Sequence, residues 1–225
     1  MVVLATKMYV HGSARERAIR SLESQVQNVL GELDVTVEIG IRHDGFPSVT
    51  VQGVDATVAR AVLREEWAEI TPELSPDERY IGTLESWDDG GFELDAGRSV
   101  RIPVDALGLG PGSPAQLVER FGLVQHQRLA FVNDDPPRLA EEERDRLYDW
   151  RRGAGRVNVN SVTRAEVRAA VNRSGHANDI VTVERLGLLE QSIVCRAETD
   201  PPGLLSAIGP YLPGEMRCVV TRPTG

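Results

Sequence analysis

The chain has 225 residues, enough for two or three small domains with cores of their own. No apolar run approaches the roughly 20 residues of a membrane span, and the first residues lack the basic start and long apolar stretch of a signal peptide. The formal net charge is −9, Lys7 is the only lysine among 25 basic residues, and two cysteines are too few for a disulfide framework. We therefore expect a cytoplasmic protein outside the membrane.

Residues 1–75 have the pattern of a small α+β domain with the order β-α-β-β-α. Ser13 and Glu16 have the spacing of a capping box, which predicts that a helix begins there. Pro72 favours a helix end just before it. The expected elements are a strand over 2–10, a helix after residue 13, strands over 35–41 and 49–51, and a helix from 55 to 71.

Residues 79–133 predict a second domain that begins with three antiparallel strands joined by tight turns. The acidic pair Asp88 and Asp89 stands before two glycines and is typical of a hairpin turn, which explains both residues without acid–base chemistry. The expected elements are strands over 80–87, 92–95 and 100–104, a helix over 115–120 and a strand over 125–132.

Residues 138–225 predict a helix followed by a third domain with the order β-α-β-β-α-β, which is typical of a ferredoxin-like fold. Thr163 and Glu166 form a second capping-box pattern. The expected elements are a helix over 139–152, a strand over 156–160, a helix after 163, strands over 180–186 and 191–197, a short helix over 200–209 and a strand over 216–220.

The middle domain resembles the first strands of the S1-type OB-fold, a nucleic-acid-binding barrel. Gly82, Leu94 to Gly97 and Ile102 to Asp105 fall on the positions of the S1 pattern. Gly90 and Glu93, however, occupy the places of the base-stacking aromatics. The predicted fold is therefore α+β, with an S1/OB-like β-barrel between two small ferredoxin-like α/β sandwich domains. Its candidate contacts with nucleic acid are Trp87, Phe92 and Arg101.

Arginines are concentrated in the last third of the chain. Nine arginines and five acidic residues lie from Arg144 to Arg185, a net charge of +4 in a chain whose total is −9. Guanidinium groups grip phosphate and stack on bases, so this segment predicts a nucleic-acid contact. The alternative is a joint between domains, in which the same arginines pair with neighbouring acids. The candidate residues are Trp150, Arg151, Arg152, Arg156, Asn158 and Asn160, of which the last three share one face of a strand.

Motifs for other chemistry are missing from the sequence. The four histidines are scattered, and no His or Cys pair has the spacing of metal ligands. No serine or cysteine stands in a nucleophile motif. The strands of the third domain also contain no aromatic residue, which argues against an RNA-recognition motif. We therefore expect no catalytic residues, no cofactor and no metal.

Three stretches identify the chain as similar to a family of archaeal proteins known only as a domain of unknown function, with the haloarchaeal branch the most similar. They are Tyr80 to Trp87, Arg120 to His126 and Asp149 to Ser161. The acidic, lysine-poor composition agrees with a salty cytoplasm. At molar salt the Debye length is about 3 Å, so the negative net charge does not exclude an RNA partner.

We expect a non-enzymatic protein of transcription, translation or RNA processing. Its partner would be single-stranded or structured RNA, or a ribonucleoprotein or transcription assembly. The alternative is a protein-interaction adaptor whose barrel no longer binds nucleic acid. The two differ in one structural respect, which is whether Trp87, Phe92 and Trp150 are exposed on a common basic surface or buried in domain joints.

Overall fold

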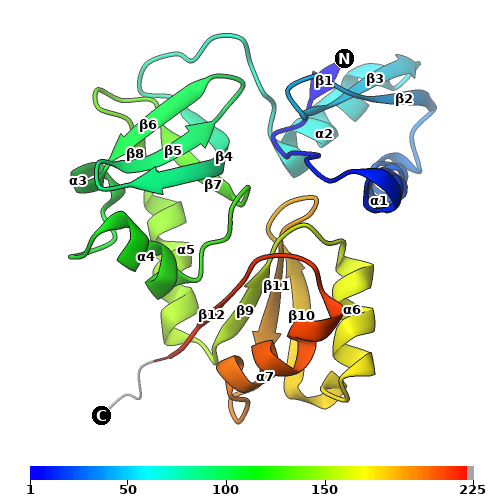
Figure 1. Cartoon of the computed structure of the whole chain (residues 1–225). Helices are drawn as coiled ribbons and strands as arrows, with labels where there is room; N and C mark the ends of the chain where they lie inside the picture. Colours follow the sequence, from blue (N-terminus) through cyan, green and yellow to red (C-terminus); the bar gives the residue numbers. More distant parts are fainter. Residues whose placement is uncertain (222–225) are drawn as a thin grey trace.

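Each third of the chain forms its own antiparallel sheet in the computed structural model, which describes residues 1–221 (Figure 1). The sheets have three, five and four strands, and helices accompany each of them. The predicted α+β class is confirmed.

The N-terminal sheet has the strand order β1-β3-β2. The apolar positions of α1 recur every four residues and face the sheet, so Ala18, Leu22, Val26 and Leu30 are buried against strand residues such as Val49. The elements are β1 (Val2–Val3), α1 (Gly12–Leu30), β2 (Val35–Ile41), β3 (Pro47–Gly53) and α2 (Ala56–Trp67).

Two local predictions for this part were wrong. The first strand is limited to Val2–Val3. The segment that follows α2 pairs with this part of the chain, since Glu69 forms a β-bridge with Leu4 and Ile70 donates a backbone hydrogen bond to Val3. Residues 68–70 thus occupy the place of a fourth strand beside β1. The capping box at Ser13 is also not formed, because His11 and not Ser13 is the N-cap of α1 and no side chain caps the helix.

The central sheet has the order β6-β5-β4-β7-β8 and curls into a half-barrel. Its edge strands β6 and β8 approach each other, but within residues 1–221 they are not paired. The helix α3 and the strand β8 were not predicted. The elements are β4 (Arg79–Asp88), β5 (Gly91–Asp95), β6 (Ser99–Pro103), α3 (Val104–Leu107), α4 (Pro114–Phe121), β7 (Arg128–Val132), β8 (Arg138–Leu139) and α5 (Glu141–Arg152).

The C-terminal sheet has the order β10-β11-β9-β12. The capping box of Thr163 and Glu166 is formed and begins α6, as predicted. The elements are β9 (Arg156–Val159), α6 (Arg164–Arg173), a 3-10 turn (Ala177–Asp179), β10 (Ile180–Arg185), β11 (Gln191–Cys195), α7 (Pro201–Ile208), a 3-10 turn (Gly209–Tyr211) and β12 (Met216–Val219).

The three parts share buried contacts. Trp150, Leu186 and Val219 belong to the same apolar cluster as the half-barrel. The turn between β10 and β11 reaches up to the N-terminal part, and its Leu188 and Leu189 join that core (Figure 1). The C-terminal sheet therefore packs against the half-barrel through one face and contacts the N-terminal part through one end.

Candidate nucleic-acid interface

The aromatic residues predicted to stack on bases do not form an exposed surface. Phe92 is 0 % exposed and Trp150 is 4 % exposed, both within the apolar cluster of the half-barrel. Trp87 is partly buried, and the guanidinium group of Arg217 lies 5.6 Å from the centre of its ring. Phe92 and Trp150 are therefore wrong as stacking residues, because their rings have no face open to a base.

Trp150 instead lies between two guanidinium groups of its own chain. Arg146 is 4.9 Å and Arg156 is 5.2 Å from the ring centre. Arg156 is also ion-paired with Glu184, and Arg146 with Glu143. The sequence predicted Arg151 and Arg152 beside Trp150, but Arg146 and Arg156 stack on the ring, in the position expected for a base.

The polar face of β9 is also buried, which corrects the prediction for Asn158 and Asn160. Nδ2 of Asn158 donates to the carbonyl of Gly122 at 2.7 Å, and Nδ2 of Asn160 donates to that of Gln125 at 3.1 Å. A Cβ added at Gly122, whose φ is +60°, would lie 2.7 Å from Val219. The strand face is thus the joint with the half-barrel, as the alternative interpretation proposed.

The other predicted arginines have partners close by. Arg101 lies on the exposed side of β6 and pairs with Asp88, whose pKa it lowers by hydrogen bonding. Arg152 is exposed and pairs with Asp149 at 3.1 Å. The guanidinium group of Arg151 lies 6.0 Å from the ring centre of Phe121. These three arginines thus have separate partners and do not form one binding site together.

A polar cluster that was not predicted lies where the three parts meet. Nζ of Lys7 pairs with Asp95 at 2.7 Å and with Glu85 at 3.1 Å. Burial alone would raise the pKa of Glu85, but His126, Thr83 and Lys7 outweigh it and lower that pKa to about 2. The rings of Tyr9 and His126 stack 3.9 Å apart. The sequence contained one signal for this cluster, which is that Lys7 is the only lysine of the chain.

An open groove of about 500 Å³ lies between α1 and α6 and is lined by three arginines. Arg17 and Arg20 come from α1, and Arg185 comes from the end of β10. Glu166 lies in the groove and pairs with Arg17 at 2.7 Å. We call this site the arginine groove.

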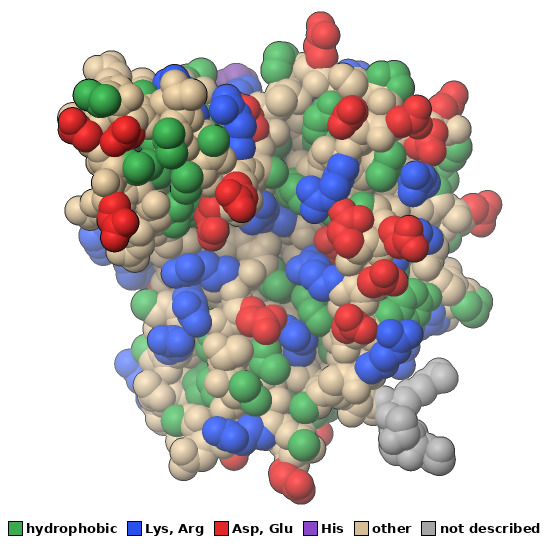
Figure 2. All heavy atoms as spheres, turned by 180° about the vertical axis from the view of Figure 1, so that it is seen from behind, with side chains coloured by type: hydrophobic (Ala, Val, Ile, Leu, Met, Phe, Trp, Pro, Cys, Tyr) green, Lys and Arg blue, Asp and Glu red, His purple; other side chains and the backbone are tan. Residues whose placement is uncertain are grey.

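Several arginines of this groove and of the neighbouring face of α6 lack a carboxylate partner in the described part of the chain. Arg20, Arg164, Arg168 and Arg185 have no ion pair among residues 1–221. Burial and the neighbouring charges of Arg168 and Arg185 lower the pKa of Arg164. Figure 2 shows basic side chains gathered across the middle of the face seen from behind. An anion bound in the groove would reduce the repulsion among these arginines.

A second hollow of about 470 Å³ shares Arg185 with the arginine groove. It is bounded by α5 and the end of β10, with Arg146 and Arg156 beside the acids Asp145 and Glu184. The charges here are mixed, so the basic character is greatest between α1 and α6.

Residues 1–221 contain no group of three or more His, Cys, Asp or Glu side chains arranged to hold a metal ion. Within the same part of the chain, every helix is too short or too polar to cross a membrane.

Three family models match the chain in succession: the DUF2110 N-terminal domain over residues 1–73, the DUF2110 central domain over 74–151 and the DUF2110 C-terminal domain over 154–220. The chain belongs to the DUF2110 family. The predicted membership of a family of unknown function is thereby confirmed, while an archaeal and halophilic origin stays a prediction. A comparison with curated proteins gave no match. In DUF2110 terms, the arginine groove lies between the N-terminal domain, which contains α1, and the C-terminal domain, which contains α6.

Proposed function

We propose that this protein is a non-enzymatic, cytoplasmic RNA-binding protein that holds the RNA backbone in the arginine groove. The observation that carries the proposal is that Arg20 and Arg185 line the groove without an ion pair within residues 1–221. Arg164 and Arg168 of α6 are also without an ion pair in this part of the chain, and Arg164 feels the charges of Arg168 and Arg185. The chain has 34 acidic residues against 25 basic ones, so arginines without carboxylate partners are not expected to gather by chance.

The mode of binding follows from which side chains are accessible. Phe92 and Trp150 are buried, so base stacking on them does not contribute. Exposed guanidinium groups bind phosphate oxygens in a bidentate way and carry no sequence information by themselves. We therefore propose backbone binding with little sequence preference. Glu166 would lose its pair with Arg17 as a phosphate enters, which favours partners with several phosphates over a single one.

The architecture is compatible with this role, and we propose a finer description of it. Counting from β4, the central sheet has the strand order 3-2-1-4-5, with helices between the third and fourth strands, which supports an S1/OB-like half-barrel. The C-terminal order 2-3-1-4 supports a ferredoxin-like domain. The N-terminal order 2-3-1 supports the same assignment, with residues 68–70 in place of its last strand.

The test is a fluorescence anisotropy titration of labelled single-stranded RNA and of an RNA hairpin at several potassium chloride concentrations. The variant is Arg20→Gln/Arg185→Gln, which removes two exposed charges that line the groove. The matched control is Arg98→Gln/Arg196→Gln, which removes two exposed charges elsewhere. We expect the groove variant to bind about tenfold or more weakly and with a smaller salt slope, since each lost phosphate contact reduces that slope by about one.

Failure is equally specific. If folded wild-type protein does not bind either RNA, or if the control variant loses as much affinity as the groove variant, the arginine groove is not an RNA site.

One observation favours the second candidate, a protein-interaction adaptor. Phe92 and Trp150 are buried in joints within the chain, and Trp87 is partly buried against Arg217, which is the arrangement that an adaptor predicts. Co-purification with a protein partner that survives ribonuclease treatment, from cells that make wild-type protein, is the expected result in that case.

A further inference from the structure

The N-terminal sheet leaves one long strand with a free edge. β2 is the last strand of the order β1-β3-β2, so the backbone groups on its outer side are paired with no strand of residues 1–221. Such an edge is a template for an additional strand. It is seven residues long, Val35 to Ile41, which is longer than many natural strands.

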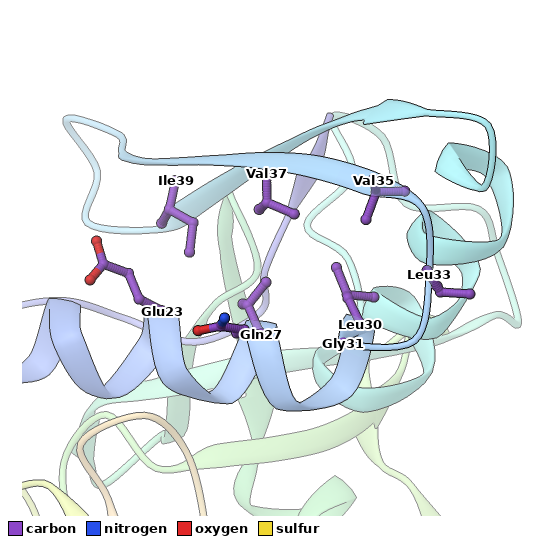
Figure 3. A pocket seen from close by; sticks show the side chains of 9 residues that line it. Glu23, Gln27, Leu30, Gly31, Leu33, Val35, Val37 and Ile39 are labelled. Carbon is purple, nitrogen blue, oxygen red and sulfur yellow. The ribbon is translucent and has the colours of Figure 1, made fainter.

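An apolar groove runs along this edge. The hollow of about 460 Å³ lies between β2 and α1, and Val35, Val37 and Ile39 point from the strand towards Gln27 and Leu30 of the helix (Figure 3). Val37 is 39 % exposed, which is high for a valine in the middle of a strand. A strand added beside β2 would send every second side chain into this groove, because side chains alternate between the two faces of a sheet.

The charged side chains that line the groove or belong to β2 are acidic. Glu23 lines the groove, and Glu38 lies on the other face of β2. Both are exposed, and neither is ion-paired with any residue of the described chain, 1–221. The occupant of this site should therefore carry positive charges beside its apolar residues.

A second copy of the chain does not satisfy that requirement. Glu38 is the central residue of β2, so a symmetric antiparallel pair in which all seven residues overlap would place Glu38 directly opposite Glu38 of the other copy. Like charges in directly opposite positions destabilise a strand pair. Self-pairing in the register of greatest overlap is thus disfavoured, whereas a basic partner would be attracted.

We propose that β2 and the β2–α1 groove bind an extended segment of another protein in which apolar and basic residues alternate. The segment adds to the sheet as an antiparallel or parallel strand next to β2. Its apolar side chains enter the groove beside Val37, and its Lys or Arg side chains lie near Glu38. This gives the adaptor alternative a defined surface. It does not rest on RNA binding, because the residues that it uses are not those of the arginine groove.

The experiment uses the full chain and a labelled peptide of about nine residues in which valine and lysine alternate. Fluorescence anisotropy measures the affinity, and hydrogen exchange measures protection of the amides of residues 35–41. The groove variants are Glu38→Lys and Val37→Lys, both at exposed positions. Their matched controls are Glu65→Lys and Val58→Lys on the exposed side of α2, which make the same changes in net charge.

We expect saturable binding that slows exchange over 35–41 and is weakened about tenfold or more by either groove variant but not by the controls. A scrambled peptide of the same composition, and one in which valine and glutamate alternate, should bind much less. Equal binding of the scrambled peptide would indicate a diffuse attraction to an acidic protein and would overturn the proposal. So would equal losses in the control variants, or sedimentation showing a dimer that Val37→Lys dissociates.

Discussion

The phenolic oxygen of Tyr9 donates a hydrogen bond of 2.6 Å to Oε1 of Glu190, which lies 181 residues further along the chain. The same oxygen accepts a hydrogen bond of 2.9 Å from the backbone N–H of Ser161. Burial raises the pKa of Tyr9, so the phenol keeps its proton. Tyr9 thereby joins the first part of the chain to the last.

Tyr9→Phe should destabilise the protein by about 1–3 kcal/mol, because it removes a partner from a fully buried carboxyl group and from a backbone amide. The free energy of unfolding, from urea denaturation followed by circular dichroism, measures the effect. Tyr211→Phe is the control, since Tyr211 is 43 % exposed, and it should change stability little. Equal stability of the Tyr9 variant and the wild type would show that the bond contributes nothing to the joint.

The stability of the protein should depend on pH through Glu190. Burial is the main cause that raises the pKa of this carboxyl group from 4.5 to about 8. Between these values the folded state keeps a proton that the unfolded state has released, so the free energy of unfolding falls as pH rises. The slope from this one group is at most about 1.4 kcal/mol per pH unit.

Glu190→Gln should remove that slope, because the amide has no proton to lose. Urea denaturation of both proteins from pH 5 to pH 8 tests it. This range avoids the acid region, in which Glu85, with its pKa of about 2, becomes protonated. Parallel profiles of wild type and variant would contradict the assignment.

Lys7 should react with amine reagents only slowly in the folded protein. Hydrogen bonds and charges from Asp95 and Glu85 outweigh burial and raise its pKa, and only 12 % of its side chain is exposed. The α-amino group of Met1, a residue 66 % exposed, should be acylated first. Mass spectrometry after brief treatment with an acylating reagent measures both sites, since the chain has no other lysine. In urea the two amines should react at more similar rates; fast labelling of Lys7 in the native protein would show that the cluster is open.

Arg156→Gln should cost about 1–2 kcal/mol of stability, since it removes one guanidinium group from the ring of Trp150 and breaks the pair with Glu184. The control is Arg152→Gln, which breaks an exposed pair with Asp149 and should cost at most about 1 kcal/mol. Thermal unfolding of the two variants side by side provides the comparison. A larger effect from the control would mean that the stacking on Trp150 contributes little.

Local signals predicted most elements but not all of their ends. The capping box of Thr163 and Glu166 begins α6 as expected, whereas the same pattern at Ser13 and Glu16 does not begin α1. In α1 the N-cap is His11, and Gly12, with a φ of +56°, is already the first helical residue when the chain reaches Ser13. Residue types alone do not show at which of several nearby positions a helix begins.

The candidate site was predicted less well, because its surroundings come from distant parts of the chain. The alternation around β9 correctly placed Asn158 and Asn160 opposite Val157 and Val159. What covers the asparagines is the segment after α4, some 35 residues earlier, and no feature of the strand itself reveals it. The arginine groove was missed for the same reason, since half of it is supplied by α1.

The contacts of the first ten residues have a consequence for how the protein is made. Thr6 accepts a hydrogen bond from the backbone of Leu188, and Tyr9 donates to Glu190. A ribosome adds residues at about 5–20 per second, so this N-terminal segment emerges well before its partners exist. The N-terminal segment therefore cannot form these hydrogen bonds until most of the chain has been synthesised. A chain that stops before Leu188 lacks the contacts that join the N-terminal part to the C-terminal part.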